Sequence, residues 1–466
     1  MRERFLLLAA ALAAFGASLG SGFHFDDYAI FSDASITSPH GWAAVWSLRQ
    51  TRPLTYLTFW LNYRLGGRDA VGYHALNLAL HLAAVLLLYE GLRRLAPGRA
   101  AWVAAAVFAV HPVQAEAVDY IWGRSIVLAA AFCFAALWAW TRERPWTAVA
   151  LFALALLAKE ECAAFPLALA LLGKWRERWR PLAAMACLSG LAAARVFYAL
   201  AVIPGAPAGA QAGISPWHYF LAQGPAIWRY LRLLVVPYGF TIDPEIHVPP
   251  VWLGLAAWAA LGALAWLTRR RPWFLVGMAL LIPSSTIFPA ADLAADRRLY
   301  LPMLGFAMLL ALLLERWKPA AAAAVVLLAA VSIARTEVWN SDAALWREAV
   351  ERAPDKVRPL VQLSRDVPAE EALRLLGRAR ALAPDDAGVA AETGKALLAS
   401  GRPGEALAEF GRALALDPRS AENYNNRGVA LAALGQMAAA RADFERALQM
   451  EPGLEEAREN LGRLGR

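Results

Sequence analysis

Long apolar runs, separated by short polar connections, fill the first 334 residues of the chain. The runs that approach the roughly 20 residues needed to cross a bilayer are 5–20, 73–92, 100–118, 125–140, 146–158, 162–173, 181–201, 251–268, 272–289, 299–314 and 319–334. This pattern predicts an all-α membrane body of about 11 spans over residues 1–334. From residue 335 onward no such run occurs, which predicts a second, non-membrane domain over 335–466.

The second domain carries a repeat. Prolines at 354, 384, 418 and 452 are 30, 34 and 34 residues apart, and 34 residues is the tetratricopeptide period. The last repeat has large and small residues at the signature positions Tyr424, Gly428, Leu431, Ala440, Phe444, Ala447 and Pro452. The preceding repeat matches with Ala390, Gly394, Leu397, Ala406, Phe410, Ala413 and Pro418. We therefore expect a tetratricopeptide α-solenoid built from helix pairs.

Basic clusters set the orientation of the body. They fall at every second connection: Arg2/Arg4, Arg93/Arg94/Arg99, Arg142/Arg144, Lys174/Arg176/Arg178/Arg180, Arg269/Arg270/Arg271 and Arg316/Lys318. By the positive-inside rule these connections and the N-terminus are cytoplasmic. The first run is expected to remain as an anchor, because no convincing small-residue cleavage site follows it. We predict a multi-pass protein of the cell (inner) membrane, with the repeat domain outside, in the periplasm.

Composition agrees with this division. Apolar residues make up 59% of the chain and charged residues 18%, against about 45–50% and about 25% in soluble domains. The part before Arg335 has a net charge of +10 and the rest of −2. Because the basic residues sit in clusters between apolar runs, no nucleic-acid partner is expected. Cys133, Cys162 and Cys187 lie in apolar segments and lack metal-ligand spacing.

An acidic pair, Asp26 and Asp27, follows the first span on the predicted outer side. Two adjacent carboxylates can act as a general base, hold a divalent ion such as Mg²⁺ or Mn²⁺, or be solvated loop charges. If both are desolvated, each raises the pKa of the other, which suits proton abstraction.

Further charges interrupt or end the apolar runs on the same side. Ionisable groups at such depth are costly and usually line a cavity or pair with one another, although snorkelling helix anchors are the alternative. The residues that interrupt or end the runs in this way are Lys159-Glu160-Glu161, then His111, Glu116 and Arg124, and finally Arg297, Arg298 and Tyr300. The segment 217–237, with Arg229 and Arg232 among apolar residues, is expected to be an interfacial or re-entrant helix.

Arginine and lysine together suit a phosphate. No glycine-rich phosphate loop or dinucleotide motif is present, which argues against a nucleotide donor. A phosphate handled at an outer membrane surface without nucleotide machinery indicates a lipid phosphate.

The motifs together resemble the transmembrane and tetratricopeptide-repeat O-mannosyltransferases and their bacterial relatives. They are Phe-Asp-Asp-Tyr at 25–28, Arg-Pro-Leu-Thr at 52–55, Phe-Trp-Leu-Asn-Tyr-Arg-Leu-Gly-Gly at 59–67, Tyr-His-Ala-Leu-Asn-Leu at 73–78, His-Pro-Val-Gln-Ala-Glu-Ala-Val at 111–118, Gly-Arg at 123–124, Ala-Lys-Glu at 158–160 and Arg-Arg-Leu-Tyr-Leu-Pro at 297–302. The resemblance implies a multispan glycosyltransferase fold of the C type that uses a polyprenyl-phosphate sugar outside the cytoplasm.

The resemblance also implies site residues. The family's acidic pair matches Asp26 and Asp27, its Lys-Glu motif matches Lys159 and Glu160, and its late arginine motif matches Arg297 and Tyr300. Two positions depart from the family pattern. Ile126 stands where an acidic residue is expected after Gly-Arg, and Asp296 replaces the usual glutamate.

We therefore predict single-displacement glycosyl transfer with inversion at the anomeric carbon. Mannose is one candidate for the transferred sugar. Asp26 or Asp27 takes the acceptor's hydroxyl proton, with or without a divalent ion at the pair. The leaving polyprenyl phosphate is held by Arg124, Lys159, Arg297 and Tyr300. Supporting roles are predicted for Arg52, His111, Glu116 and Glu160.

The acceptor is expected to be a protein Ser or Thr hydroxyl, recruited by the repeats. Alternatives are transfer to a lipid-linked or cell-surface glycan, or a non-catalytic membrane scaffold that presents the repeats. A transporter is disfavoured because no internal symmetry is evident within residues 1–334.

Overall fold

The computed structural model describes the chain apart from residues 97, 203–212, 287, 291, 315 and 465–466, so the start of the loop before residue 217 lies outside the described residues. The chain forms two compact units, Met1–Ser341 and Asp342–Arg466. The sequence placed the boundary at 334, where the apolar run ends. The last helix of the first unit continues past that point to Val338, because its polar end still packs against the body.

The first unit consists of helices. The longer ones are α1 (Arg2–Phe15), α5 (Pro53–Gly66), α6 (Ala70–Leu92), α7 (Ala100–Val110), α9 (Arg124–Thr141), α10 (Pro145–Ala158), α11 (Phe165–Leu171), α12 (Trp179–Val202), α13 (Pro216–Val235), α14 (Val251–Thr268), α15 (Trp273–Leu281), α16 (Met303–Leu314) and α17 (Lys318–Val338). Single-turn helices are α2 (Ala29–Ser32), α3 (Ala34–Thr37), α4 (Gly41–Ala44) and α8 (Ala115–Val118). Short 3₁₀ segments lie at Gly16–Gly20, Phe25–Tyr28, Pro112–Gln114, Ile121–Gly123, Glu160–Ala164 and Asp296–Leu299.

Among the described residues, six helical segments are long and apolar enough to cross a membrane, and a seventh is added if one pair bent by 50° counts as a span. The six are Arg2–Gly20, Ala70–Leu92, Ile121–Thr141, Trp179–Val202, Val251–Thr268 and Lys318–Val338, and the bent pair is Ala100–Val110 with Pro112–Val118. A multi-pass membrane protein is thus confirmed. Other predicted runs form shorter helices, such as α10 with 14 residues and α15 with 9.

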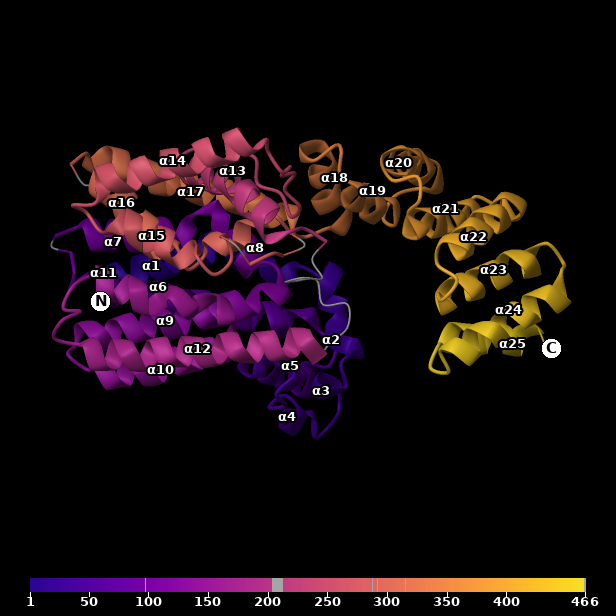
Figure 1. Cartoon of the computed structure of the whole chain (residues 1–466), viewed down its shortest axis with the longest axis horizontal. Helices are drawn as coiled ribbons and strands as arrows, with labels where there is room; N and C mark the ends of the chain where they lie inside the picture. Colours follow the sequence, from indigo (N-terminus) through magenta and orange to yellow (C-terminus); the bar gives the residue numbers. More distant parts are fainter. Residues whose placement is uncertain (97, 203–212, 287, 291, 315, 465–466) are drawn as a thin grey trace. The chain divides into compact units, whose positions relative to one another are not determined.

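Two sets of helices build the body. In the first, α9 lies between α6 and α10, and α12 packs on α10 (Figure 1). In the second, α16 packs against α7 and α15, while α17 packs against α1 and α7. Contacts between α6 and α7 join the sets. The alanine-rich α7 is buried along nearly its whole length, because small side chains let neighbouring helix backbones approach closely.

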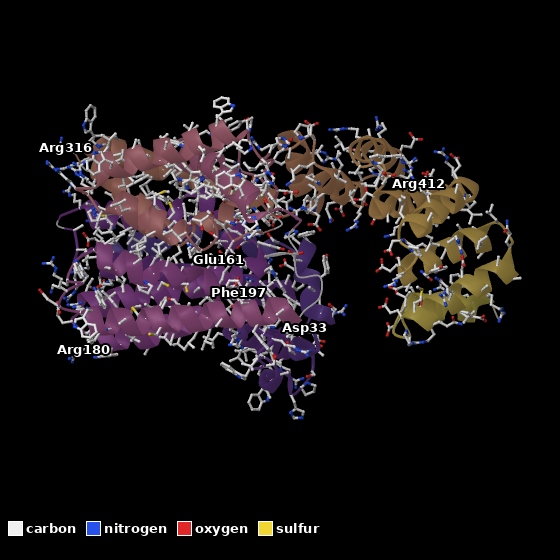
Figure 2. The ribbon with its side chains drawn as sticks, viewed as in Figure 1. Asp33, Glu161, Arg180, Phe197, Arg316 and Arg412 are labelled. Atoms are coloured by element: carbon white, nitrogen blue, oxygen red, sulfur yellow. The ribbon has the colours of Figure 1, made fainter. Side chains whose placement is uncertain are left out.

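The two ends of the body carry different residues. Figure 2 shows Arg180 and Arg316, from two of the basic clusters, at one end and Asp33, from the first loop, at the other. Glu161 lies between these ends in this view. Polar groups of the Lys159 segment therefore lie within the helical body and not at its basic end.

The second unit is a row of helix pairs. Its helices are α18 (Asp342–Arg352), α19 (Val357–Ser364), α20 (Ala369–Leu382), α21 (Ala387–Ala399), α22 (Pro403–Leu416), α23 (Ala421–Ala433), α24 (Met437–Met450) and α25 (Glu455–Leu464). Successive helices pack on one another. Gly394 faces Phe410 and Gly428 faces Phe444 so closely that a Cβ would lie 2.6 and 2.7 Å from the ring. The predicted small and large signature positions form these contacts.

Candidate active site

The acidic pair lies in the 3₁₀ turn Phe25–Tyr28. Asp26 is exposed, whereas Asp27 is fully buried. The Asp27 carboxylate accepts the main-chain N–H of His24 at 2.9 Å and that of Trp122 at 2.8 Å, one on each oxygen. Burial raises the pKa of Asp27 to about 7, although both N–H groups oppose the rise. Phe25 precedes the pair with φ +44°, a conformation that residues with a Cβ rarely adopt.

The predicted break after α10 is present. Lys159 has an extended backbone, and the chain turns through Glu160–Ala164 before α11 begins at Phe165. The Lys159 ammonium is buried and lies 3.2 Å from a Glu161 oxygen. Burial lowers the pKa of Lys159 to about 8, although Glu161 opposes the shift.

Arg52 and Glu160 form a two-pronged ion pair beside this break. Arg52 donates from Nε at 3.0 Å and from Nη2 at 2.6 Å to the two oxygens of Glu160. Burial favours the neutral acid, but the Arg52 guanidinium outweighs it and lowers the pKa of Glu160 to about 2. Glu160 is therefore an anion whose charge Arg52 compensates.

Arg297 is paired in the same manner with Glu116. Its main-chain N–H donates to Glu116 Oε2 at 2.9 Å, its side chain bonds the other oxygen, and Asp292 Oδ2 lies 3.5 Å from Nη2. The contact joins α8 to the 3₁₀ turn before α16. Glu116 thus orients Arg297.

Arg298 differs from its neighbour. It donates to the Tyr219 hydroxyl at 3.2 Å and to the main-chain carbonyls of Leu293 at 3.2 Å and Asp292 at 2.7 Å. Within the described part of the chain no ion pair holds it. Neutral acceptors fix its direction while its charge stays available to an anion.

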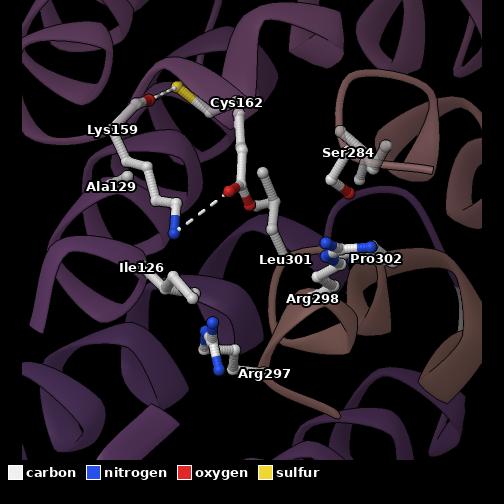
Figure 3. A pocket seen from close by; sticks show the side chains of 11 residues that line it. Ile126, Ala129, Lys159, Cys162, Ser284, Arg297, Arg298, Leu301 and Pro302 are labelled. Atoms are coloured by element: carbon white, nitrogen blue, oxygen red, sulfur yellow. Dashed lines mark hydrogen bonds and ion pairs between the residues drawn. The ribbon is translucent and has the colours of Figure 1, made fainter. Parts of the chain in front are cut away.

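Three of these cations line one pocket. Figure 3 shows Lys159, Arg297 and Arg298 around it, with Ile126 and Ala129 of α9 on one side and Ser284 and Pro302 on another. Ile126, which stands where the resemblance described above leads us to expect an acid, is in the wall. An ammonium and two guanidinium groups around one space suit a phosphate.

A larger cavity of about 640 Å³ adjoins this pocket, since Glu161, Ser284 and Arg298 line both. Arg52, Tyr56 and Glu160 form its polar wall. Its apolar wall comes from α12 and the segment after α15: Ala193, Val196, Phe197, Ala199, Leu200, Pro283, Phe288 and Ala290. The two spaces together present charged groups beside an apolar surface, as a lipid phosphate requires.

Tyr120 connects the acidic turn with the arginines. It is buried, and Trp122, two residues later, supplies an N–H to Asp27. Burial raises the pKa of the Tyr120 hydroxyl well above its ordinary value; the charges of Asp27 and Asp26 add to the rise, and Arg297 opposes it. The hydroxyl therefore lies within electrostatic range of both groups.

Arg124 and Tyr300 do not line the pocket. Arg124 is fully buried and donates to Asn77 Oδ1 at 2.8 Å, Asn62 Oδ1 at 2.6 Å and the Tyr73 carbonyl at 2.9 Å. Tyr300 is hydrogen-bonded through its hydroxyl to His81 Nδ1 at 2.8 Å. These contacts hold α5, α6 and α9 together and fix the turn that carries the arginines.

His111 is also a packing residue. Its Nδ1 accepts the N–H of Val113 at 3.2 Å, and its Nε2 lies 3.3 Å from the Leu234 carbonyl. This is the geometry of a neutral ring that caps the turn after α7 and ties it to α13.

A divalent ion at Asp26 and Asp27 is one of the alternatives that the sequence leaves open. Both Asp27 oxygens already accept main-chain N–H groups. In the described ranges, no group of three or more His, Cys, Asp or Glu side chains is placed to hold a metal. The donors around Asp27 suit a carboxylate that fixes the turn.

Residues 391–455 match the tetratricopeptide repeat family. Over 263 residues the chain is 30% identical to "Protein O-mannosyl-transferase Tmtc2" of Drosophila melanogaster, and this covers 47% of the chain and 27% of that protein. Over 185 residues it is 30% identical to human "Protein O-mannosyl-transferase TMTC3", covering 34% and 20% respectively. The chain is a distant relative of these transferases.

The chain spans only a fifth to about a quarter of the length of these two relatives. Among solved structures, the chain is similar to ArnT from Cupriavidus metallidurans bound to undecaprenyl phosphate, with 15% identity, a TM-score of 0.41, and coverage of 90% of this chain and 80% of that one. The repeats are similar to TTC0263, a thermophilic tetratricopeptide protein of Thermus thermophilus, with 20% identity, a TM-score of 0.25, and coverage of 33% and 95%.

The sequence motifs placed Arg298 in a charged cluster but gave it no role of its own. Its signal was present, since Arg298 directly follows Arg297 in the late motif. Glu161 was noted only as part of the charged break, yet it lines both spaces and pairs with Lys159. Adjacent residues in a tight turn point in different directions, and the pattern alone does not say which of them faces a cavity.

Proposed function

We propose that the chain is a membrane glycosyltransferase that moves a sugar from a polyprenyl-phosphate donor to a hydroxyl acceptor. The observation that carries this proposal is the pocket of Lys159, Arg297 and Arg298 beside an apolar-walled cavity. The cations suit the phosphate, and the wall formed by α12 suits the polyprenyl chain. The relatives' name supports mannose as the sugar and a protein as the acceptor.

Asp26 is the proposed base. It is exposed at the turn, whereas Asp27 is occupied by two main-chain N–H groups and serves to hold the turn. The acceptor oxygen attacks the anomeric carbon and loses its proton to Asp26. The bond between that carbon and the phosphate oxygen breaks with inversion, and the electron pair leaves with the polyprenyl phosphate.

The leaving group needs charge stabilisation more than a proton. Arg298 and Lys159 contact the phosphate directly in this scheme, and Arg297, oriented by Glu116, completes the cationic side. Arg52 keeps Glu160 ionised and paired, so that its charge does not repel the donor. No step is assigned to a metal.

The reaction is proposed to occur on the outer side of the membrane. Arg180 and Arg316 lie at the end of the body opposite Asp33, as expected if the basic end is cytoplasmic (Figure 2). Single cysteines at Ser32 and Glu177, in a variant with Cys187→Ser, test this orientation. A membrane-impermeant thiol reagent should label the Ser32 site in intact cells and the Glu177 site only after lysis; the reverse pattern contradicts it.

Donor turnover by the purified full-length chain tests the chemistry. With a polyprenyl-phosphate sugar and a peptide acceptor, Asp26→Asn should lower transfer by about 10²–10⁴-fold while donor binding persists. Asp33→Asn, the same substitution at the N-cap of α3 in the same loop, is the matched control and should retain transfer. If the two variants behave alike, Asp26 is not the base, and if the wild type releases no polyprenyl phosphate the proposed function fails.

A further inference from the structure

The C-terminal end of α17 packs directly on the segments that carry the acidic turn. Thr336 Oγ1 donates to Asp119 Oδ2 at 2.9 Å and lies 3.3 Å from the Ala14 carbonyl. On the other side, Ser21 Oγ donates to Asn340 Oδ1 at 2.6 Å. These contacts fix the backbone on both sides of Trp339.

The Trp339 side chain is fully buried and lies against His24 and Tyr120, which are close to the acidic pair. Its ring meets His24 edge-on at 6.0 Å between centroids and lies against Tyr120 at 5.6 Å. The His24 main-chain N–H is one of the two donors to Asp27. The indole therefore supports both His24, the residue that precedes the turn, and Tyr120.

The turn needs such support because its backbone is unfavourable. Phe25 has φ +44°, and a residue with a Cβ keeps that conformation only where its surroundings enforce it. The Asp27 N–H bonds back to the His24 carbonyl at 2.8 Å, so displacement of His24 loosens the whole turn.

We propose that Trp339 is a positioning residue that holds the acidic turn in its reactive shape. This deepens the proposed function and rests on it for the catalytic consequence. The repeat unit begins at Asp342, three residues later, so the segment that enters the repeats is the one that fixes the turn.

Amide hydrogen exchange on the full-length chain in detergent tests the structural half, whether or not the protein is an enzyme. Trp339→Ala should speed exchange across residues 24–28 by about tenfold or more, because the turn then opens locally. Trp339→Phe should keep protection, since the indole Nε1 has no hydrogen-bond partner among the described residues. Leu328→Ala, buried three turns earlier on α17, is the control and should leave residues 24–28 unchanged.

Trp339→Leu keeps the test decisive if the alanine variant does not fold, and it should give a smaller rise. Unchanged exchange in both variants, or an equal rise in Leu328→Ala, overturns the proposal. In transfer assays Trp339→Ala should lower kcat with little change in the KM for the donor, and Trp339→Phe should restore kcat. If Trp339→Ala speeds exchange at residues 24–28 but keeps the wild-type kcat, the proposal is also overturned. If Trp339→Ala speeds exchange but the wild-type chain itself shows no transfer, only the proposed function is refuted.

Discussion

The carboxyl group of Asp27 is subject to two opposing effects. Burial favours its neutral form, and two main-chain N–H groups favour the anion. The result is a pKa raised to about 7. Because this value exceeds the ordinary 3.8, the contribution of Asp27 to stability is fully present below about pH 3.8 and is lost as the pH rises through about 7. The two N–H bonds to Asp27 are nevertheless strongest with the anion, so ionisation tightens the turn locally while it lowers the stability of the whole fold.

Transfer should therefore show a bell-shaped pH profile. On the acid side kcat/KM rises as Asp27 ionises near pH 7, and on the alkaline side it falls as Lys159 loses its proton near pH 8. Lys159→Arg keeps the cation at higher pH, so its alkaline limb should move upward while the acid limb stays. An unmoved alkaline limb in that variant would mean that Lys159 does not set it.

Arg298 should contribute strongly to the binding of the donor phosphate. Arg298→Ala removes a charge-assisted contact of about 1.5–3 kcal/mol, which weakens the donor Kd by roughly 10–150-fold. Arg298→Lys should recover part of this, because lysine provides charge without the fork. Arg232→Ala, at an exposed arginine of α13, is the matched control in a titration with labelled donor. Equal affinities of the Arg298→Ala and Arg232→Ala variants would contradict the assignment.

At this scale the sequence predicted the presence of charged groups better than their directions. Lys159 and Arg297 do meet in one pocket. Arg124 and Tyr300 come from equally specific motifs but bond to Asn77 and His81 inside the body. A motif places a residue on a segment, and the tertiary packing of the other segments decides which cavity or core it enters.

Two glycines set the joint between α15 and α16. A Cβ on Gly305 would lie 2.3 Å from the Trp273 carbonyl oxygen and 2.4 Å from the Gly277 nitrogen, and one on Gly277 would lie 2.5 Å from the Phe306 ring. Backbone atoms cannot move aside as a flexible side chain can. The close approach fixes the two helices that flank the turn of Arg297 and Arg298.

Gly305→Ala should therefore destabilise the body by about 1–3 kcal/mol through overpacking, which a thermal-unfolding scan in detergent detects as a lower Tm. Gly262→Ala is the matched control, because the added methyl on α14 meets no atom within 4 Å. That variant should unfold at or slightly above the wild-type temperature. An unchanged Tm in Gly305→Ala would show that the joint relaxes without cost.

The apolar runs predicted where most of the helices lie, but they predicted the lengths of these helices less well. The break at Lys159 was visible as a charge run, and it does separate α10 from α11. The run 272–289 was expected to be one span, yet α15 ends at Leu281. Hydropathy averages over a window and does not register where a proline or a turn ends the helix, as Pro283 follows here.

At the scale of the molecule, the sequence pattern predicted two parts. The repeat period and the charge difference separate them, and the described residues fall into two compact units. The repeat match covers 391–455, and the helix pairs before it follow the same plan. The role of these repeats in acceptor recruitment is a proposal.

A chain ending at Ser341 tests that role. Recruitment predicts that transfer to a folded protein acceptor falls sharply, while transfer to a short soluble peptide and release of polyprenyl phosphate persist. A concave repeat surface binds extended segments and adds effective concentration at the site. If both acceptors lose transfer equally in a truncated chain that still binds donor, the repeats do not recruit.

The length of α10 has a consequence for the lipid around it. Its 14 residues span about 21 Å, whereas the hydrocarbon of a typical bilayer is about 30 Å thick. Lys159, directly after the helix, must then lie below the level of the headgroups unless the bilayer thins beside it. Membrane elasticity would oppose each approach of the donor phosphate to that depth. Turnover in proteoliposomes should therefore decrease as acyl chains lengthen, and a rate independent of chain length would mean that surrounding helices shield the site from mismatch.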